Sequence, residues 1–266
     1  MTATGGEVLD VLGAAAAEVR GALDDLLDWG PAGTRPGQYF SDLAADTAAV
    51  DVLVGAGFGV LSEESGETDA DRPIVVVLDP VDGSTNASRG IPWFATSLCA
   101  LDGDGPLASL VVNQATGQSF GAVRGEGAWQ WYARAGADGP REPVRPSRAD
   151  TIGSSLIALS GYPRESFGWQ QYRAFGASAL DICAVACGMA DGFVDCSADA
   201  HGAWDYLGAL LVCTEAGAVV ADALGRELVV RGHRDRRTPV AAATPALLEA
   251  LLAERRASQG EVTKKG

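Results

Sequence analysis

Apolar residues recur every three or four positions early in the chain, which is the spacing of amphipathic helices. The first repeat spans residues 7–29 and stops at Gly30-Pro31, a pair that ends helices. A second repeat covers residues 43–53 and ends before Gly55 and Gly57. The pattern then changes to short apolar runs separated by turn residues, which is typical of strands. Such strands are predicted at residues 58–61, 74–78, 93–101, 107–112 and 119–123.

The second half of the chain alternates short apolar runs with helical repeats. Strands are predicted at residues 155–159, 193–195, 218–221 and 240–243, and helices at 179–189, 204–216 and 244–253. Between them and the first half, residues 134–150 are rich in Gly, Pro and Arg, which indicates a surface connection. We therefore predict an α+β half over residues 1–140 and an α/β half over residues 141–266, packed as one unit with a layered α/β architecture.

Composition excludes several classes of protein. The 266 residues include 20 Lys and Arg against 35 Asp and Glu, a net charge of −15, with 47% hydrophobic residues. A chain this apolar can bury a core, which excludes wholesale disorder. Its acidic surface repels phosphodiester backbones and anionic membranes, so we expect neither a nucleic-acid nor a membrane partner. The longest strongly aliphatic stretch, Ile74 to Leu78, is far shorter than the roughly 20 residues that span a bilayer.

Cysteine and histidine usage narrows the candidate chemistry. The five cysteines contain no CxxC pair, and their odd number argues against a disulfide framework, so we expect reduced cysteines in a cytoplasmic protein. Only His201 and His233 are available, which makes a histidine-rich zinc site a poor fit. A hard cation held by carboxylates fits the composition better.

The most informative segment is Asp79-Pro80-Val81-Asp82-Gly83-Ser84-Thr85-Asn86, directly after an apolar run. Side chains at the carboxyl end of a buried strand are where α/β proteins collect chemistry. Two carboxylates three positions apart across a proline turn can converge on one cation. The glycine permits close approach of the backbone, and the amides of residues 83–85 can form an anion nest. An ordinary Asx turn capped by Asp79 is the alternative interpretation.

Two other acidic segments also lie next to predicted elements. Glu63 and Glu64 follow the predicted strand at residues 58–61, and Asp205 opens the predicted helix at residues 204–216. Each has an alternative explanation: the glutamates as a solvated charged loop, and Asp205 as a first-turn acid favoured by the helix dipole.

The combination and order of these segments resemble the inositol monophosphatase family of metal-dependent, lithium-sensitive phosphomonoesterases. The family has a Glu-Glu-Ser loop, an Asp-Pro-Ile-Asp-Gly-Thr type motif, and a Trp-Asp helix that ends in Glu-Ala-Gly. Here these appear as residues 63–65, 79–84 and 204–217, and the resemblance covers residues 42–222. It implies a layered αβαβα sandwich of the sugar-phosphatase type, with the metal and phosphate motifs in the first half and the Trp-Asp ligand and leaving-group pocket in the second.

The resemblance also implies two or three Mg²⁺ ions. One ion would be bound by Glu63, Asp79 and the backbone carbonyl of Val81, and a second by Asp79, Asp82 and Asp205. Asp46 matches an acidic residue linked to a third, weaker ion. The preceding segment lacks the lysine and threonine usual in the family, which leaves the third site open.

The resemblance further implies roles in the reaction. Gly83, Ser84 and Thr85 would hold the phosphate through backbone amides. Glu63 and Ser84 would orient and deprotonate a water that the cation activates, and Glu64 would be a supporting acid. That water would attack phosphorus directly, without a phosphoenzyme, because no histidine lies near these motifs to act as nucleophile.

The leaving-group side departs further from the family pattern. The Gly-Ser/Thr-Ala segment of the family appears here as Gly176, Ala177 and Ser178, with the hydroxyl displaced by one position. Asp195 matches an acid that hydrogen-bonds sugar hydroxyls in inositol phosphatases, although a surface turn acid at the end of a strand is an equal alternative. His201 we interpret as a surface residue.

We therefore predict a Mg²⁺-dependent phosphatase that acts on myo-inositol monophosphate or a related sugar or polyol phosphate. Fructose bisphosphatase, histidinol-phosphate phosphatase and phosphoadenosine-phosphate phosphatase activities stay open, because the metal core of the family is shared and the leaving-group pocket is not. A non-catalytic, ion-responsive regulatory protein on the same fold is the alternative outside enzymology. We expect a homodimer from the family resemblance.

Overall fold

A computed structural model describes residues 3–134 and 137–260, and two β-sheets organise them. Within these residues the first sheet has nine strands in the order β2-β1-β3-β4-β5-β6-β7-β8, with β9 also paired to β7. Its strands are β1 (Gly59–Ser62), β2 (Gly66–Thr68), β3 (Val75–Asp82), β4 (Ala95–Asp102), β5 (Gly105–Asn113), β6 (Gln118–Val123), β7 (Gly127–Arg134), β8 (Ala137–Asp138) and β9 (Glu142–Pro143). It is antiparallel except where β1 pairs with β3 in parallel.

The second sheet is smaller and mixed, with strand order β11-β10-β12-β14-β13. Its strands are β10 (Leu156–Ser160), β11 (Gln171–Arg173), β12 (Gly192–Asp195), β13 (Val219–Asp222) and β14 (Pro239–Ala242). The two sheets thus follow one another along the chain, one ending at Pro143 and the other beginning at Leu156. The division at residue 140 stays a prediction.

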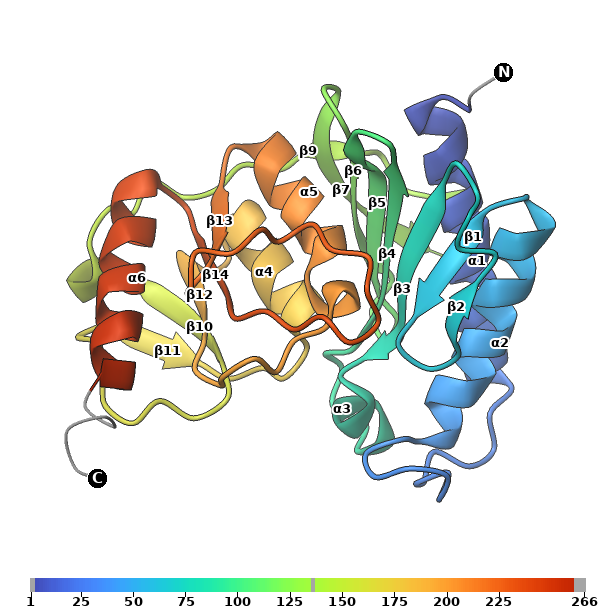
Figure 1. Cartoon of the computed structure of the whole chain (residues 1–266), viewed down its shortest axis with the longest axis horizontal. Helices are drawn as coiled ribbons and strands as arrows, with labels where there is room; N and C mark the ends of the chain where they lie inside the picture. Colours follow the sequence, from blue (N-terminus) through green and yellow to red (C-terminus); the bar gives the residue numbers. More distant parts are fainter. Residues whose placement is uncertain (1–2, 135–136, 261–266) are drawn as a thin grey trace.

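Helices form the other layers (Figure 1). α1 (Gly5–Asp24) and α2 (Phe40–Gly55) cover the outer face of the first sheet, where fully buried apolar side chains such as Val8, Leu12 and Leu53 form the core. Thr4 and Glu7 form a capping box that fixes the start of α1.

A second pair of helices, α4 (Ser178–Ala186) and α5 (Leu207–Ala216), lies between the two sheets. Every residue of α4 is buried, as expected for a helix with a sheet on each side. α6 (Pro245–Gly260) covers the outer face of the second sheet. The predicted αβαβα sandwich is confirmed.

Several predicted boundaries were wrong for local reasons. α1 ends at Asp24 instead of continuing to residue 29, and Leu27 is fully exposed. The predicted helix at residues 204–216 is interrupted at Tyr206, so that a 3-10 turn, η2 (Ala203–Asp205), precedes α5. Part of the predicted surface connection belongs to the first sheet as β8 and β9. Across the described residues, no helix has the length and hydropathy needed to cross a membrane.

Candidate metal and phosphate site

Two neighbouring parallel strands bring the first two carboxylates together. Ser62 at the end of β1 pairs with Leu78 in β3, so Glu63, just beyond β1, and Asp79, still within β3, follow this pair on neighbouring strands. The backbone N–H of Glu63 donates to the carbonyl of Leu78 at 3.0 Å, which extends the register to the glutamate. The carboxyl ends of adjacent parallel strands are a common place for functional groups.

The third carboxylate comes from the second half of the chain. Asp205 ends η2, and the hydroxyl of Ser97 in β4 donates to the carbonyl of Trp204 at 3.0 Å, which ties this turn to the first sheet. Gly208 allows α5 to begin close to the sheet, because an added Cβ would lie 2.8 Å from Ser97 Oγ and 3.1 Å from Val111 Cγ2.

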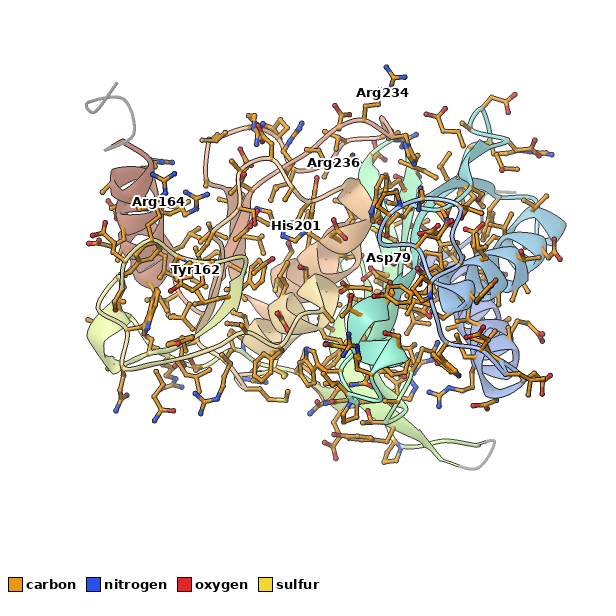
Figure 2. All side chains as sticks on the ribbon, turned by 90° about the horizontal axis from the view of Figure 1, so that it is seen from below. Asp79, Tyr162, Arg164, His201, Arg234 and Arg236 are labelled. Atoms are coloured by element: carbon orange, nitrogen blue, oxygen red, sulfur yellow. The ribbon has the colours of Figure 1, made fainter. Side chains whose placement is uncertain are left out.

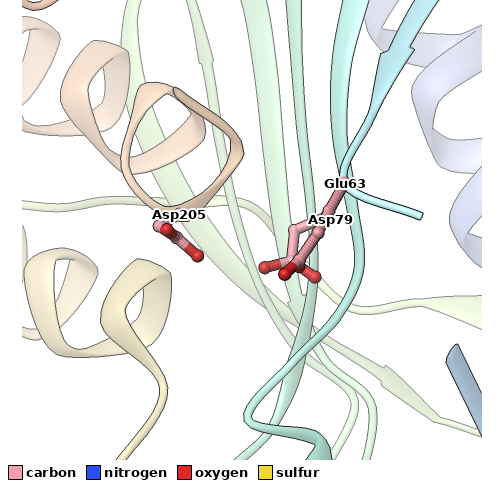
Figure 3. Close-up of side chains that lie close together, drawn as sticks. All are labelled: Glu63, Asp79 and Asp205. Atoms are coloured by element: carbon pink, nitrogen blue, oxygen red, sulfur yellow. The ribbon is translucent and has the colours of Figure 1, made fainter. Parts of the chain in front are cut away.

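Glu63, Asp79 and Asp205 form one acidic cluster (Figure 3). Each offers a carboxylate oxygen, and these three oxygens lie within 4.8 Å of one another. Burial, followed by repulsion from neighbouring carboxylates, raises the pKa of Glu63 to about 8 and that of Asp79 well above its usual value. A cation would relieve this repulsion, and an all-oxygen donor set suits Mg²⁺, so the residues present fit the expected metal.

Asp82 lies beside the cluster, after an irregularity in the pairing of β3 with β4 between residues 79 and 82. This break contains Pro80, and the Asp82 carboxylate lies close enough to Glu63 and Asp79 for its charge to raise the pKa of both. One carboxylate oxygen of Asp82 accepts the backbone N–H of Ala179 at 2.6 Å. Burial and then the charge of Asp205 raise the pKa of Asp82 to about 7, against a lowering contribution from the Ala179 bond.

The chain turns sharply at Gly83 before the short helix α3 (Ser84–Ser88). Gly83 has φ 90° and ψ 35°, and an added Cβ would lie 3.1 Å from the carbonyl oxygen of Gly176 and 3.2 Å from that of Trp93. Glycine is therefore required here both for conformation and for space. The first N–H groups of α3 lack upstream helical carbonyls, as at any helix start.

The model of the inositol monophosphatase family matches residues 45–260, which is most of the chain and includes every residue of the acidic cluster. The chain belongs to the inositol monophosphatase family. This membership makes it a phosphomonoesterase of a metal-dependent family.

Individual relatives carry different activities. Inositol-1-monophosphatase from Mesorhizobium japonicum is 33% identical over 208 residues, which cover 70% of this chain and 73% of that protein. Fructose-1,6-bisphosphatase from Pyrococcus furiosus is 28% identical over 212 residues, which cover 79% and 80%. The solved structure of extragenic suppressor protein SuhB from Bartonella henselae has a TM-score of 0.75 at 27% identity, with 94% of this chain and 99% of that chain covered.

Ser84 was predicted to orient the attacking water, and its hydroxyl donates to the carbonyl of Val81 at 3.0 Å. Thr85 is exposed, and its hydroxyl lies 3.3 Å from the Tyr39 hydroxyl. Ser84 and Val81 are thus brought together with the aspartates of the same motif. The roles of Val81 as a ligand and of residues 83–85 as the phosphate nest stay predictions.

Glu64 and Asp46 have partners outside the acidic cluster. The Glu64 carboxylate lies 2.6 Å from the guanidinium of Arg35 and accepts from the Gln38 amide. Asp46 accepts the hydroxyl of Ser62. Their roles as supporting acid and third-ion ligand stay predictions.

The segment predicted to face the leaving group lies against the turn at Gly83. Ala177 Cβ would lie 3.1 Å from a Cβ on Gly83, and the amide of Asn86 donates to the carbonyls of Trp93 and Phe175 at 2.8 and 2.7 Å. Asn86 therefore joins α3 to the segment that contains Gly176 and Ser178. Whether that segment contacts substrate stays a prediction.

The interpretation of His201 as a surface residue is wrong. The residue is 8% exposed, and its ring lies between the carboxylates of Asp195 and Asp205. Asp195 is not at the surface either, since it is fully buried. It does form a turn, because one carboxylate oxygen accepts the backbone N–H of Ser197 at 2.8 Å.

Asp42 is a buried acid beside the site that our sequence predictions did not include. It is 4% exposed near the start of α2, accepts the backbone N–H of Tyr39 at 2.8 Å, and lies next to Ser84. Burial raises its pKa to about 6, although the Tyr39 N–H and the neighbouring Ser84 lower it. Asp42 lies three residues after Tyr39, at the start of α2, and nothing in the local sequence indicates that Ser84 lies next to it.

Proposed function

We propose that this protein hydrolyses a phosphate monoester with Mg²⁺ by direct attack of water on phosphorus. The observation that carries the proposal is the cluster of Glu63, Asp79 and Asp205, built from two strands of one half and a turn of the other. It lies at the end of β3, where the chain then turns at Gly83. An acidic cluster next to a backbone turn is the pairing that a cation-assisted phosphatase needs.

The residues would divide the work between cation and substrate. Glu63, Asp79 and the backbone carbonyl of Val81 would hold one ion, and Asp79, Asp82 and Asp205 would hold a second. A divalent cation, when bound, neutralises the phosphate and lowers the pKa of the attacking water. Glu63 and Ser84 would orient that water and take its proton, and the Ser84 hydroxyl already donates to the Val81 carbonyl.

For the substrate we propose myo-inositol monophosphate or a related sugar or polyol phosphate. The inositol-1-monophosphatase from M. japonicum supports this choice, and the fructose-1,6-bisphosphatase from P. furiosus supports fructose 1,6-bisphosphate as the second candidate. Histidinol phosphate and phosphoadenosine phosphate follow, since the leaving-group pocket decides among them.

Finer properties belong to the same proposal. Mg²⁺ should support turnover better than Ca²⁺, which is larger and less strictly octahedral. Lithium should inhibit at millimolar order, as the family resemblance implies. The family resemblance also supports a homodimer, and the cysteine usage supports a cytoplasmic location.

A side-by-side hydrolysis assay tests the proposal. Chelator-treated protein is given inositol 1-phosphate, fructose 1,6-bisphosphate, histidinol phosphate, phosphoadenosine phosphate and an aryl phosphate, each with and without Mg²⁺. We expect the highest kcat/KM for a polyol or sugar phosphate and background rates without the ion. A protein that binds Mg²⁺ and hydrolyses none of them would instead support the ion-responsive regulatory alternative.

A further inference from the structure

The buried imidazole of His201 bridges the acidic cluster and a second carboxylate. His201 Nδ1 lies 3.3 Å from an oxygen of Asp205, and Nε2 lies 3.6 Å from an oxygen of Asp195 and 3.1 Å from the Ser160 hydroxyl. In Figure 2 the labelled His201 lies on one side of the junction between the two halves and Asp79 lies on the other. The ring thus connects the site to the second sheet.

Asp195 has no exposed surface at which to bind a substrate hydroxyl. The residue is fully buried, and one carboxylate oxygen accepts the Ser197 N–H. Its backbone carbonyl accepts from the guanidinium of Arg255 at 2.6 Å. Among the described residues, its other carboxylate oxygen has no hydrogen-bond partner, and it is this oxygen that faces the His201 ring.

The backbone holds His201 in this position. Its N–H donates to the carbonyl of Arg237 at 3.3 Å, and its carbonyl accepts the N–H of Arg237 at 2.8 Å. The edge of the ring packs against Phe193 with centroids 6.5 Å apart. Because backbone hydrogen bonds and the Phe193 contact hold the His201 ring in place, the ring can orient the Asp205 carboxylate next to it.

Contacts on Asp205 leave one carboxylate oxygen for a cation. The N–H of Gly202 donates to Oδ2 at 2.7 Å, and His201 Nδ1 lies next to the same oxygen. Among the described residues, Oδ1 accepts no hydrogen bond and stays available. Histidines that hydrogen-bond a ligand from outside the coordination sphere commonly set its orientation and change metal affinity by about 10- to 100-fold.

We propose that His201 is a positioning residue for Asp205, and that Asp195 acts on the cation site only through His201. Asp195 then orients the imidazole and does not contact substrate, which replaces the role implied by its resemblance to the sugar-binding acid of inositol phosphatases. This inference rests on the proposed function, because it takes Asp205 as a cation ligand.

Calorimetric titration with Mg²⁺, without substrate, measures the effect directly. His201→Ala should weaken Mg²⁺ binding by about 10- to 100-fold. His201→Asn should restore affinity to within about threefold of wild type, since its amide can donate from near the position of Nδ1. Asp195→Ala alone should weaken Mg²⁺ binding several-fold. Combined with His201→Ala it should have no further effect, because Asp195 acts only through the His201 ring, which that variant has already removed.

Asp199→Asn is the matched control. It neutralises an acid of the same loop that pairs with Arg226 at 2.7 Å, and it should leave Mg²⁺ affinity unchanged. Melting temperatures show whether each variant folds. If Asp195→Ala does not fold, the two His201 variants still decide.

Substrate selectivity gives an independent readout. The ratio of kcat/KM for inositol 1-phosphate to that for an aryl phosphate should be the same in Asp195→Ala and wild type. Unchanged Mg²⁺ affinity in His201→Ala, additive losses in the double variant, or a selective loss of the polyol substrate in Asp195→Ala would each overturn the inference while leaving the proposed phosphatase intact. A wild-type protein that neither binds Mg²⁺ nor hydrolyses phosphate esters would overturn both.

Discussion

At the scale of single residues, the negative charge of Asp82 serves metal binding but lowers the stability of the metal-free folded protein. Burial and the nearby Asp205 raise its pKa to about 7, so the charged form is unfavourable in the folded protein without metal. Asp82→Asn should lower kcat by at least about a hundredfold by removing a ligand charge. It should also raise the metal-free melting temperature by about 2–4 °C, which corresponds to about 1 kcal/mol in a chain of this size.

Asp102→Asn is the control for that substitution. Asp102 pairs with Arg124 at 2.6 Å, outside the site, and the guanidinium lowers its pKa. This variant should keep wild-type turnover and gain no stability. Equal kcat values for Asp82→Asn and wild type would remove Asp82 from the ligand set.

The role of a residue was predictable from the sequence where the residue lies in a short motif whose chemistry is recognisable. Asp79, Glu63 and Asp205 were identified from three short segments, and the structure brings them together. His201 and Asp42 were not, because their importance comes from contacts with residues distant in the chain, such as Asp195 and Ser84. A histidine in a loop is expected at the surface, whereas the fold buries His201 between two acids.

At the scale of elements, the turn at Gly83 joins the two halves. Gly83→Ala should destabilise the protein by more than the about 1 kcal/mol expected for a left-handed alanine, because the new Cβ would press on the Gly176 and Trp93 carbonyls. It should also reduce turnover, since the displaced turn carries Ser84. Denaturant unfolding and steady-state kinetics measure the two effects.

Gly57→Ala is the control that separates backbone strain from steric crowding at Gly83. Gly57 has φ 84°, close to that of Gly83, but nothing lies within 4 Å of an added Cβ. It should therefore show the conformational cost alone and normal turnover. Equal losses of stability at the two positions would contradict the packing argument.

Periodicity predicted long elements and missed short ones. α2, β3 and α4 carry enough apolar positions to be recognised, whereas α3 has five residues and β11 has three exposed ones. These short elements are held by tertiary contacts, such as the Asn86 amide to two carbonyls. A pattern of apolar positions contains no such information.

At the scale of the whole molecule, the buried acids should make stability depend on pH and metal together. The pKa of Glu63 rises from its usual 4.5 to about 8, and that of Asp42 from 3.8 to about 6. Between these values the folded metal-free protein holds protons that the unfolded chain has released, so the free energy of unfolding falls as pH rises from about 4 to 8. Mg²⁺ binding favours the charged carboxylates and should reverse this trend.

Thermal unfolding at pH 5.5 and pH 8, with chelator or with Mg²⁺, checks the sign. The metal-free melting temperature should be higher at pH 5.5, and the increase caused by Mg²⁺ should be larger at pH 8. The control is Asp42→Asn, which should reduce the pH dependence below pH 6. A metal-free melting temperature that rises with pH would contradict the assignment of protonated buried acids.

The most direct test of the central claim is turnover of inositol 1-phosphate by chelator-treated protein as Mg²⁺ is added back, in wild type and in Asp79→Asn. Asp79 is the most buried of the three clustered acids and belongs to both proposed ligand sets. If the acidic cluster binds the catalytic Mg²⁺, there should be no turnover without Mg²⁺, and turnover by the wild type should recover in a saturable way. The rate of Asp79→Asn should be at least about a hundredfold lower at every Mg²⁺ concentration. Full activity in the chelated protein, or equal recovery in the two proteins, would contradict it.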